Sequence, residues 1–304
     1  MRDPLSLDPP AAAVPRPRLA LAAGDGRLRR RRLVDAAMTA LIGGGTLVAV
    51  GVLWFILAYI AKEGAPALNW AFFTRDPAPL GEAGGGVAPA ILGSLLIVGV
   101  GALLGVPLGV GAGIYLAEFG RGRFAGGVRF LADLLTGLPS IAVGAFAWAI
   151  LVRRVVGHYN AVAGGVALAI IMLPIIARTV EEVLKLVPNG LREASLALGV
   201  PRWKTTLRVI LPVARGGIVT GVVLALARAG GETAPLLLTA LGNNFRSLNV
   251  LAPVDALPLR IYVYAKSPYA DSHTQAWGAS LVLIAVIGLL SLGVRLATRG
   301  ARRR

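Results

Sequence analysis

The sequence predicts an all-α membrane protein in which six transmembrane helices run between two cytoplasmic termini, and three observations lead to this prediction. The 304 residues are 56% hydrophobic and 15% charged, whereas soluble domains average about 25% charged residues. Basic residues are concentrated in every second segment between the apolar stretches, as expected when these segments lie on the same side of a membrane. Six segments supply the roughly 20 apolar residues that a helix needs to cross a bilayer: 34–60, 90–116, 128–151, 161–180, 213–240 and 276–297.

The basic residues behind the net charge of +16 lie mostly on one side of the predicted membrane. With the N-terminus in the cytoplasm, 23 of the 31 Lys and Arg residues fall on the cytoplasmic side, seven fall in outer loops, and Arg228 lies inside a span. This asymmetry follows the positive-inside rule and attracts anionic lipid headgroups. We therefore expect membrane lipid, and no nucleic acid, to account for the basic charge.

The composition divides the chain into three parts. Residues 1–33 contain four prolines after residue 8 and the run Arg29–Arg32, and we predict a disordered basic cytoplasmic tail. Residues 34–297 form the predicted six-span domain, and residues 298–304 form a second basic tail. A cleaved signal peptide is the alternative for the N-terminus, but the apolar segment is too long and lacks an A-x-A site.

Several classes of function are excluded by what the sequence lacks. There is no cysteine, and the two histidines, His158 and His273, are far apart, so we expect no metal site. The spans contain too few titratable residues for a membrane enzyme. No lysine follows a glycine, so a Walker A loop is missing and we expect no nucleotide or other cofactor on this chain.

Glycines recur at every fourth position of the second span, at Gly101, Gly105, Gly109 and Gly113. This spacing predicts a smooth stripe that lets a neighbouring helix approach closely; general loosening of the helix is the alternative. Beyond this span, we expect Glu118 to form a solvated pair with the arginines of the following loop. Asp133, early in the third span, is expected to bond to helix backbone at the interface.

The cytoplasmic loop 188–212 predicts two short helices. The first begins near Pro188, which suits a first helical turn, and ends at Gly199, which suits the left-handed position after a helix. The second begins at Pro201. The first helix carries an apolar face formed by Leu191, Ala194 and Leu198.

This loop resembles the EAA motif of ABC-importer permeases, whose pattern is E-A-A, three residues, G, nine residues, I-x-L-P. The matching residues are Glu193, Ala194, Ser195, Gly199, Val209, Leu211 and Pro212. Ser195 stands for the second Ala and Val209 for the Ile. The resemblance implies the type I ABC-importer permease fold, with Glu193, Ala194, Ser195, Gly199, Leu211 and Pro212 coupling the chain to a separate ATPase that binds ATP and Mg²⁺. The alternative is an amphipathic loop that lies on the membrane.

The fifth span carries two charges, Arg228 and Glu232, at an i, i+4 spacing that allows them to pair. One charge at the centre of a bilayer costs about 2.5–3.5 kcal/mol on insertion scales. Gly230-Gly231 and Pro235 loosen the helix beside them, and freed backbone groups must face protein or water. These features predict a lined pathway, with simple mutual neutralisation as the alternative.

The segment from Arg228 to Ala240 is similar to the signature of the PstA family, which are permease subunits of phosphate importers. Residues 115–119, 137–141 and 173–182 fit the same family, and the resemblance covers about residues 36–297. It implies a bacterial inner-membrane location, phosphate as the substrate, and Arg228, Glu232 and Thr233 along its pathway. The implied partners are a PstC-like permease, two PstB-like ATPase subunits and a PstS-like phosphate-binding protein.

Other functions remain as alternatives. A permease for another oxyanion, such as sulfate or molybdate, shares the coupling block, although the segment around Arg228 favours phosphate. A secondary transporter or channel needs no ATPase-docking block and is typically built from inverted repeats, which the sequence does not show.

Overall fold

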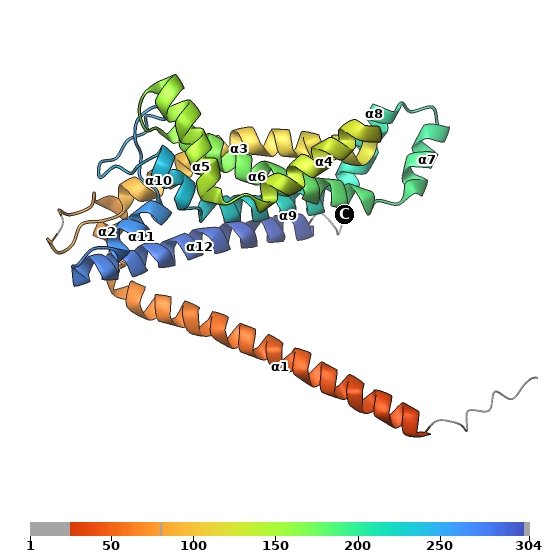
Figure 1. The fold of residues 1–304 in the computed structure, drawn as a ribbon, viewed down its shortest axis with the longest axis horizontal. Coiled ribbons are helices and arrows are strands. Elements are labelled where there is room, and N and C mark those ends of the chain that lie inside the picture. The colour runs from red at the N-terminus through yellow and green to blue at the C-terminus, as the bar shows by residue number, and fades with distance from the viewer. Residues whose placement is uncertain (1–24, 80, 301–304) are drawn as a thin grey trace, which may run out of the picture. The chain divides into compact units, whose positions relative to one another are not determined.

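The computed structural model describes residues 25–79 and 81–300, and within these ranges its regular structure is helical apart from two isolated β-bridges (Figure 1). The α-helices are α1 (Asp25–Gly64), α2 (Trp70–Thr74), α3 (Ala88–Ile114), α4 (Gly122–Gly137), α5 (Ser140–Ala147), α6 (Ala161–Lys185), α7 (Asn189–Ala197), α8 (Arg202–Thr205), α9 (Leu211–Gly230), α10 (Ala234–Thr239), α11 (Leu257–Ala265) and α12 (Ala270–Gly300). Short 3-10 or π segments adjoin several of them: η1 (Ala65–Ala67), η2 (Tyr115–Phe119), η3 (Trp148–Val156) and η4 (Thr206–Ile210).

Two units make up the chain, divided within α1 between Leu57 and Ala58. In the first unit, α1 is a helix whose described side chains are exposed. Helix α1 includes residues 25–33, so the prediction that these residues are disordered is wrong. Residues 1–24 and 301–304, which belong to the two predicted tails, lie outside the described residues. The second unit contains the packed helices and every site discussed below.

Five helical stretches of the described chain are long and apolar enough to cross a membrane: 28–67, 88–119, 161–185, 202–230 and 270–293. The sixth predicted span, 128–151, is not one continuous helix. Its place is taken by α4 and by α5 with η3, which meet at an angle of 103°. The described residues contain six spans if this bent pair crosses the membrane as one unit, and five if it does not. Pro139 explains the break, because a proline disfavours helical backbone at the residue before it, and Leu138 is extended with ψ 138°.

The fifth span also ends earlier than predicted. Helix α9 stops at Gly230, and after a break over residues 231–233 the separate short helix α10 runs from Ala234 to Thr239. Gly230-Gly231 weakens the helix, and Pro235 begins the next one.

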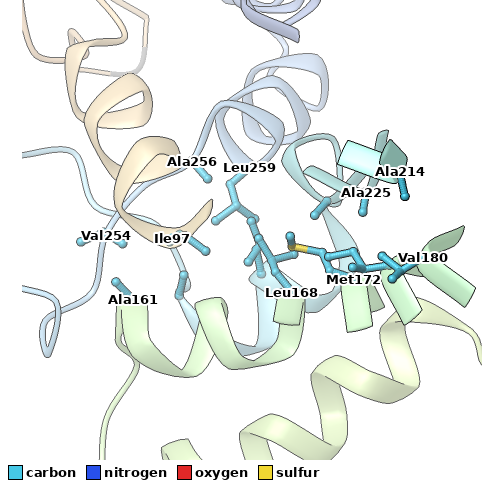
Figure 2. Close-up of a cluster of buried hydrophobic side chains, with 14 of the residues drawn as sticks. Ile97, Ala161, Leu168, Met172, Val180, Ala214, Ala225, Val254, Ala256 and Leu259 are labelled. Carbon is cyan, nitrogen blue, oxygen red and sulfur yellow. The ribbon is translucent and has the colours of Figure 1, made fainter. Parts of the chain in front are cut away.

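The glycine stripe of α3 lies against α6, which confirms the predicted close approach. The stripe meets Gly165, Ala169, Ile176 and Ala177 in turn. Buried side chains from α3, α6, α9 and the segment before α11 then form the main apolar core around Leu168 and Met172 (Figure 2).

Replacing Gly113 with Ala is expected to destabilise this packing. A Cβ there would lie 2.6 Å from the backbone oxygen of Ala177, and a backbone atom cannot turn away. Overpacking of this kind costs about 1–3 kcal/mol. Gly111 on the same helix is the matched control, because a Cβ there has no atom within 4 Å. Thermal unfolding of the detergent-purified chain should show a lower midpoint for Gly113→Ala only; equal midpoints would contradict the packing argument.

Candidate functional site

Two breaks in the helices of the second unit lie beside one common cavity. One separates α4 from α5, and the other separates α9 from α10. Helices α5 and α10 lie side by side, with Pro235 close to Gly144 (Figure 1). The backbone therefore departs from regular helix at two neighbouring places in segments that sequence analysis assigns to the membrane, where irregular backbone must face protein or a polar cavity.

Arg228 and Glu232 lie at the second break. Arg228 is in the last turn of α9, and Glu232 follows the helix, with its N–H donating to the carbonyl of Ala229. The Arg228 Nε and Glu232 Oε1 atoms are 3.9 Å apart, and the two side chains are 59% and 16% exposed. The predicted pairing is confirmed, although Glu232 is outside the helix. At this distance the pair leaves the guanidinium available to another acceptor.

A cavity of about 260 Å³ joins this pair to the first break. Its volume is several times the ~30 Å³ that one water molecule occupies in the liquid, so it has room for a small anion. Its lining residues are Leu135, Thr136, Leu138, Pro139, Ser140, Ile171, Ile175, Arg228 and Glu232. Thr233 is not among them; it is the residue before α10 and is half-buried.

The sequence did not point to Thr136 and Ser140 as part of this site. Thr136 lies in the last turn of α4 and its hydroxyl donates to the carbonyl of Ala132, so its oxygen remains an acceptor. Ser140 begins α5. The signal that could have found them is the Pro139-Ser140 pair within an apolar segment, because a break in a membrane helix exposes polar groups that need a lined space.

A cluster of charges fixes α4 against α6. The fully buried Glu181 carboxylate accepts hydrogen bonds from Arg129 at 2.7 Å, Lys185 at 2.6 Å and Arg178 at 3.3 Å. Arg178 also binds both carboxylate oxygens of Asp133 at 2.7 Å. The expectation that Asp133 bonds to helix backbone is therefore wrong, because an arginine from α6 reaches it.

The EAA segment forms the two short helices that the sequence predicted. Helix α7 follows Pro188, α8 follows Pro201, and Gly199 between them has φ +77°, a left-handed conformation that favours glycine. Glu193 and Ala194 are exposed. Exposed apolar side chains surround them: Leu191, Leu196, Leu198 and Trp203. This surface of α7 and α8 is open to a partner.

Two of the other EAA residues, Ser195 and Leu211, face the rest of the second unit. Ser195 is buried, and its hydroxyl lies 2.9 Å from that of Thr205 on α8. Leu211 packs against the main core, whereas Pro212 is exposed in the first turn of α9. Ser195 and Leu211 thus hold the segment in place, while Glu193 and Ala194 are presented outward.

Glu118 differs from expectation. It was predicted to be solvated and paired with loop arginines, but it is 7% exposed. Its carboxylate accepts a 2.6 Å hydrogen bond from Arg192 of α7. Because these two residues are 74 positions apart, sequence spacing could not pair them.

A second polar cavity, of about 390 Å³, lies beside α11 in the predicted outer loop. Arg260 donates to the buried Asp255 carboxylate at 2.6 Å and to the Asn244 side chain at 2.9 Å. Burial raises the pKa of Asp255 above its ordinary value despite the opposing charge of Arg260. In the part of the chain that the structure describes, no group of three or more His, Asp or Glu side chains converges as metal ligands would.

Comparison with known proteins shows that the sequence is similar to one family of transport proteins. The sequence profile described as "Binding-protein-dependent transport system inner membrane component" matches residues 109–304. The chain is 46% identical to the Phosphate transport system permease protein PstA of Haemophilus influenzae, over 80% of this chain and 86% of that protein. It is 41% identical to PstA of Xylella fastidiosa strain Temecula1, over 88% and 93% of the two chains. PstA 1 of Mycobacterium tuberculosis strain H37Rv is 36% identical over 91% of each.

The fold has a counterpart among solved structures. The inward-facing methionine ABC transporter MetNI aligns with a TM-score of 0.59 and 22% identity, covering 71% of this chain and 95% of its own. This likeness concerns the fold, which is that of a type I ABC-importer permease. With its apolar helices and these relatives, the protein is a multi-pass inner-membrane component of an ABC transporter, and it belongs to the PstA family of binding-protein-dependent permeases.

Proposed function

We propose that the chain is the permease subunit of an ATP-driven phosphate importer and forms half of the translocation pathway. The observation that carries the proposal is the Arg228–Glu232 pair beside a 260 Å³ cavity between two helix breaks. The relatives named for phosphate transport support the substrate. A permease for sulfate or molybdate is the weaker candidate.

The chemistry of the pair suits an anion that must be bound and released. Arginine stays charged, and its planar fork matches the oxygens of a tetrahedral oxyanion. Glu232 competes for the same guanidinium from 3.9 Å and so weakens anion binding. A pathway needs this balance, because a site that holds its cargo tightly transports it slowly. Thr233 adjoins the pair and is proposed to support Glu232 at the start of α10.

The energy is proposed to come from partners. Two PstB-like ATPase subunits would hold ATP and Mg²⁺, with one of them binding the exposed Glu193 surface of α7 and α8. A PstC-like permease would complete the pathway, and a PstS-like protein would deliver phosphate from outside. The chain itself would bind no cofactor and perform no chemical step, while the assembled complex would act as a phosphate translocase.

Purification of the tagged chain in mild detergent tests the assembly. We expect an ATPase and a second six-span permease to copurify, and the complex in proteoliposomes to take up phosphate only with ATP and the binding protein. A tenfold excess of sulfate or molybdate should leave uptake unchanged. A chain that runs alone and conducts phosphate without ATP would contradict the proposal, and inhibition by sulfate would favour the other oxyanions.

The docking surface can be tested in the same preparation. Glu193→Lys reverses an exposed charge on α7 and should lower ATPase copurification about tenfold, as the loss of a charge-assisted contact predicts. Glu182→Lys is the matched control, because Glu182 is exposed near the end of α6 and outside α7. Equal ATPase recovery in both variants would exclude Glu193 from the interface.

A further inference from the structure

Besides its packing against α8 and η4, the coupling helix α7 is held to the rest of the permease by side-chain hydrogen bonds at two points. Within the described residues, side-chain bonds from Arg192 and Ser195 make these attachments. Most other positions of this nine-residue helix are exposed. A displacement of α7 can therefore reach the membrane helices through these two side-chain attachments, through the packing of α7 against α8 and η4, and through the backbone at its ends.

The Arg192 attachment uses every nitrogen of the guanidinium. Nη2 donates to Glu118 at 2.6 Å and to the carbonyl of Leu184 at 2.8 Å. Nη1 donates to the carbonyl of Val187 at 2.7 Å and approaches the Asn189 side chain at 3.3 Å, while Nε faces the Glu118 carboxylate at 3.2 Å. Such multiply bonded arginines are geometrically rigid.

This attachment joins α7 to the closely packed helices α3 and α6, here called the α3–α6 block. Glu118 lies in η2, which continues α3, and Leu184 is in the last turn of α6. Helices α3 and α6 pack along the glycine stripe, so their separation is fixed. The positive guanidinium also lies at the C-terminal end of α6, where the helix dipole favours a cation.

The Ser195 attachment leads elsewhere. Thr205 belongs to the continuous helical stretch 202–230, which ends in the turn that carries Arg228. At 1.5 Å per residue, about 35 Å of helix separates Thr205 from Arg228. Helix α7 therefore bridges the α3–α6 block and the helix that ends beside the candidate pathway.

We infer that Arg192 and Glu118 are positioning residues which anchor α7 to the α3–α6 block, so that a displacement of α7 by the ATPase moves the helix that carries Arg228. Without this anchor, α7 is retained through Ser195 and through its flanking turns at Pro188 and Gly199. It then swivels instead of transmitting the displacement. ATP is hydrolysed, but the pathway does not respond. This inference rests on the proposed function, since it requires an ATPase partner that acts on α7.

Glu118→Gln is the sharpest variant, because it removes the charge from the pair while the shape of the side chain and the backbone contacts of Arg192 remain. In proteoliposomes that hold the complete complex, we expect ATP hydrolysis within about twofold of the original, with phosphate uptake per ATP lower by about tenfold. Glu118→Asp keeps the charge and should restore part of this ratio. Asp133→Asn is the matched control: it disrupts another carboxylate–arginine pair between helices, with no contact to α7, and should leave the ratio unchanged.

The ratio separates this inference from the proposed function. If the unchanged complex fails to take up phosphate, the proposed function fails; the ratio can then be measured with the oxyanion that is transported. An unchanged ratio in Glu118→Gln would overturn the inference. Loss of the ATPase from the variant complex would also overturn it, because Glu118 would then serve assembly. Should Glu118→Gln not insert, an unchanged ratio in Arg192→Lys, which loses the planar fork that Glu118 accepts from, would have the same meaning.

Discussion

Replacing Arg228 with Gln should reduce ATP-driven phosphate uptake by about 100-fold, because the variant loses the charged fork that we propose meets the anion. A hydrogen bond to a charged group contributes about 1.5–3 kcal/mol, and 1.4 kcal/mol corresponds to a factor of ten. Gln has a similar length but presents a neutral amide. The measurement is uptake of radiolabelled phosphate by cells or proteoliposomes, with the assembled complex quantified in each sample.

Two further variants make this result specific. Arg154→Gln removes an exposed arginine at the end of η3, away from the residues that line the cavity, and should transport normally. Glu232→Gln removes the competing carboxylate, so we expect the complex to bind phosphate more tightly and to release it more slowly. Normal uptake by Arg228→Gln with full assembly would exclude Arg228 from the pathway.

Glu181→Gln should produce the largest loss of stability. Glu181 is fully buried and accepts hydrogen bonds from Arg129, Arg178 and Lys185. Without the Glu181 carboxylate, Arg129 and Lys185 lose their anionic partner and repel each other around a neutral amide, while Arg178 keeps its bonds to Asp133. Breaking a buried ion pair costs about 3–5 kcal/mol, and we expect about 3 kcal/mol because the arginines retain partial access to water. Thermal unfolding in detergent should show a midpoint several degrees lower.

The neighbouring residue provides the control for that measurement. Glu182 is exposed one position along the same helix, so Glu182→Gln should leave the midpoint within experimental scatter. If both variants melt alike, the charge cluster does not hold α4 on α6. If Glu181→Gln melts at a lower temperature and α4 also becomes accessible to a protease, the charge cluster anchors that half of the bent helix.

Local features of the fold were predictable because their causes are local. Gly199 fits a left-handed turn, and Pro188 and Pro201 each precede a helix, so the two short helices of the EAA segment followed from residue types at fixed spacing. The glycine stripe of α3 predicted a close helix neighbour for the same reason. Arg228 and Glu232 were visible because charges are rare in apolar segments.

The breaks in the helices were only partly predictable. The Gly230-Gly231 pair was recognised as a weak point, yet its segment and the segment that contains Pro139 were both expected to continue as single spans. Hydropathy measures whether a segment is apolar enough to cross, and it does not register a 103° bend. Thr136 and Ser140 became part of the site only when the bend brought them to the cavity.

The sequence by itself determined that the protein is a helical membrane protein, where its EAA segment lies and which arginine is exceptional; its orientation in the membrane stays a prediction. These conclusions depend on composition, periodicity and neighbouring residues, which the chain carries wherever it folds. The tertiary structure alone decided that Glu118 meets Arg192 and that Arg129 of α4 reaches Glu181, whereas Arg178 and Lys185 already neighbour Glu181 along α6. Such pairs join residues 74 and 52 positions apart, and a carboxylate in an apolar protein interior binds whichever cation the packing of the helices brings to it.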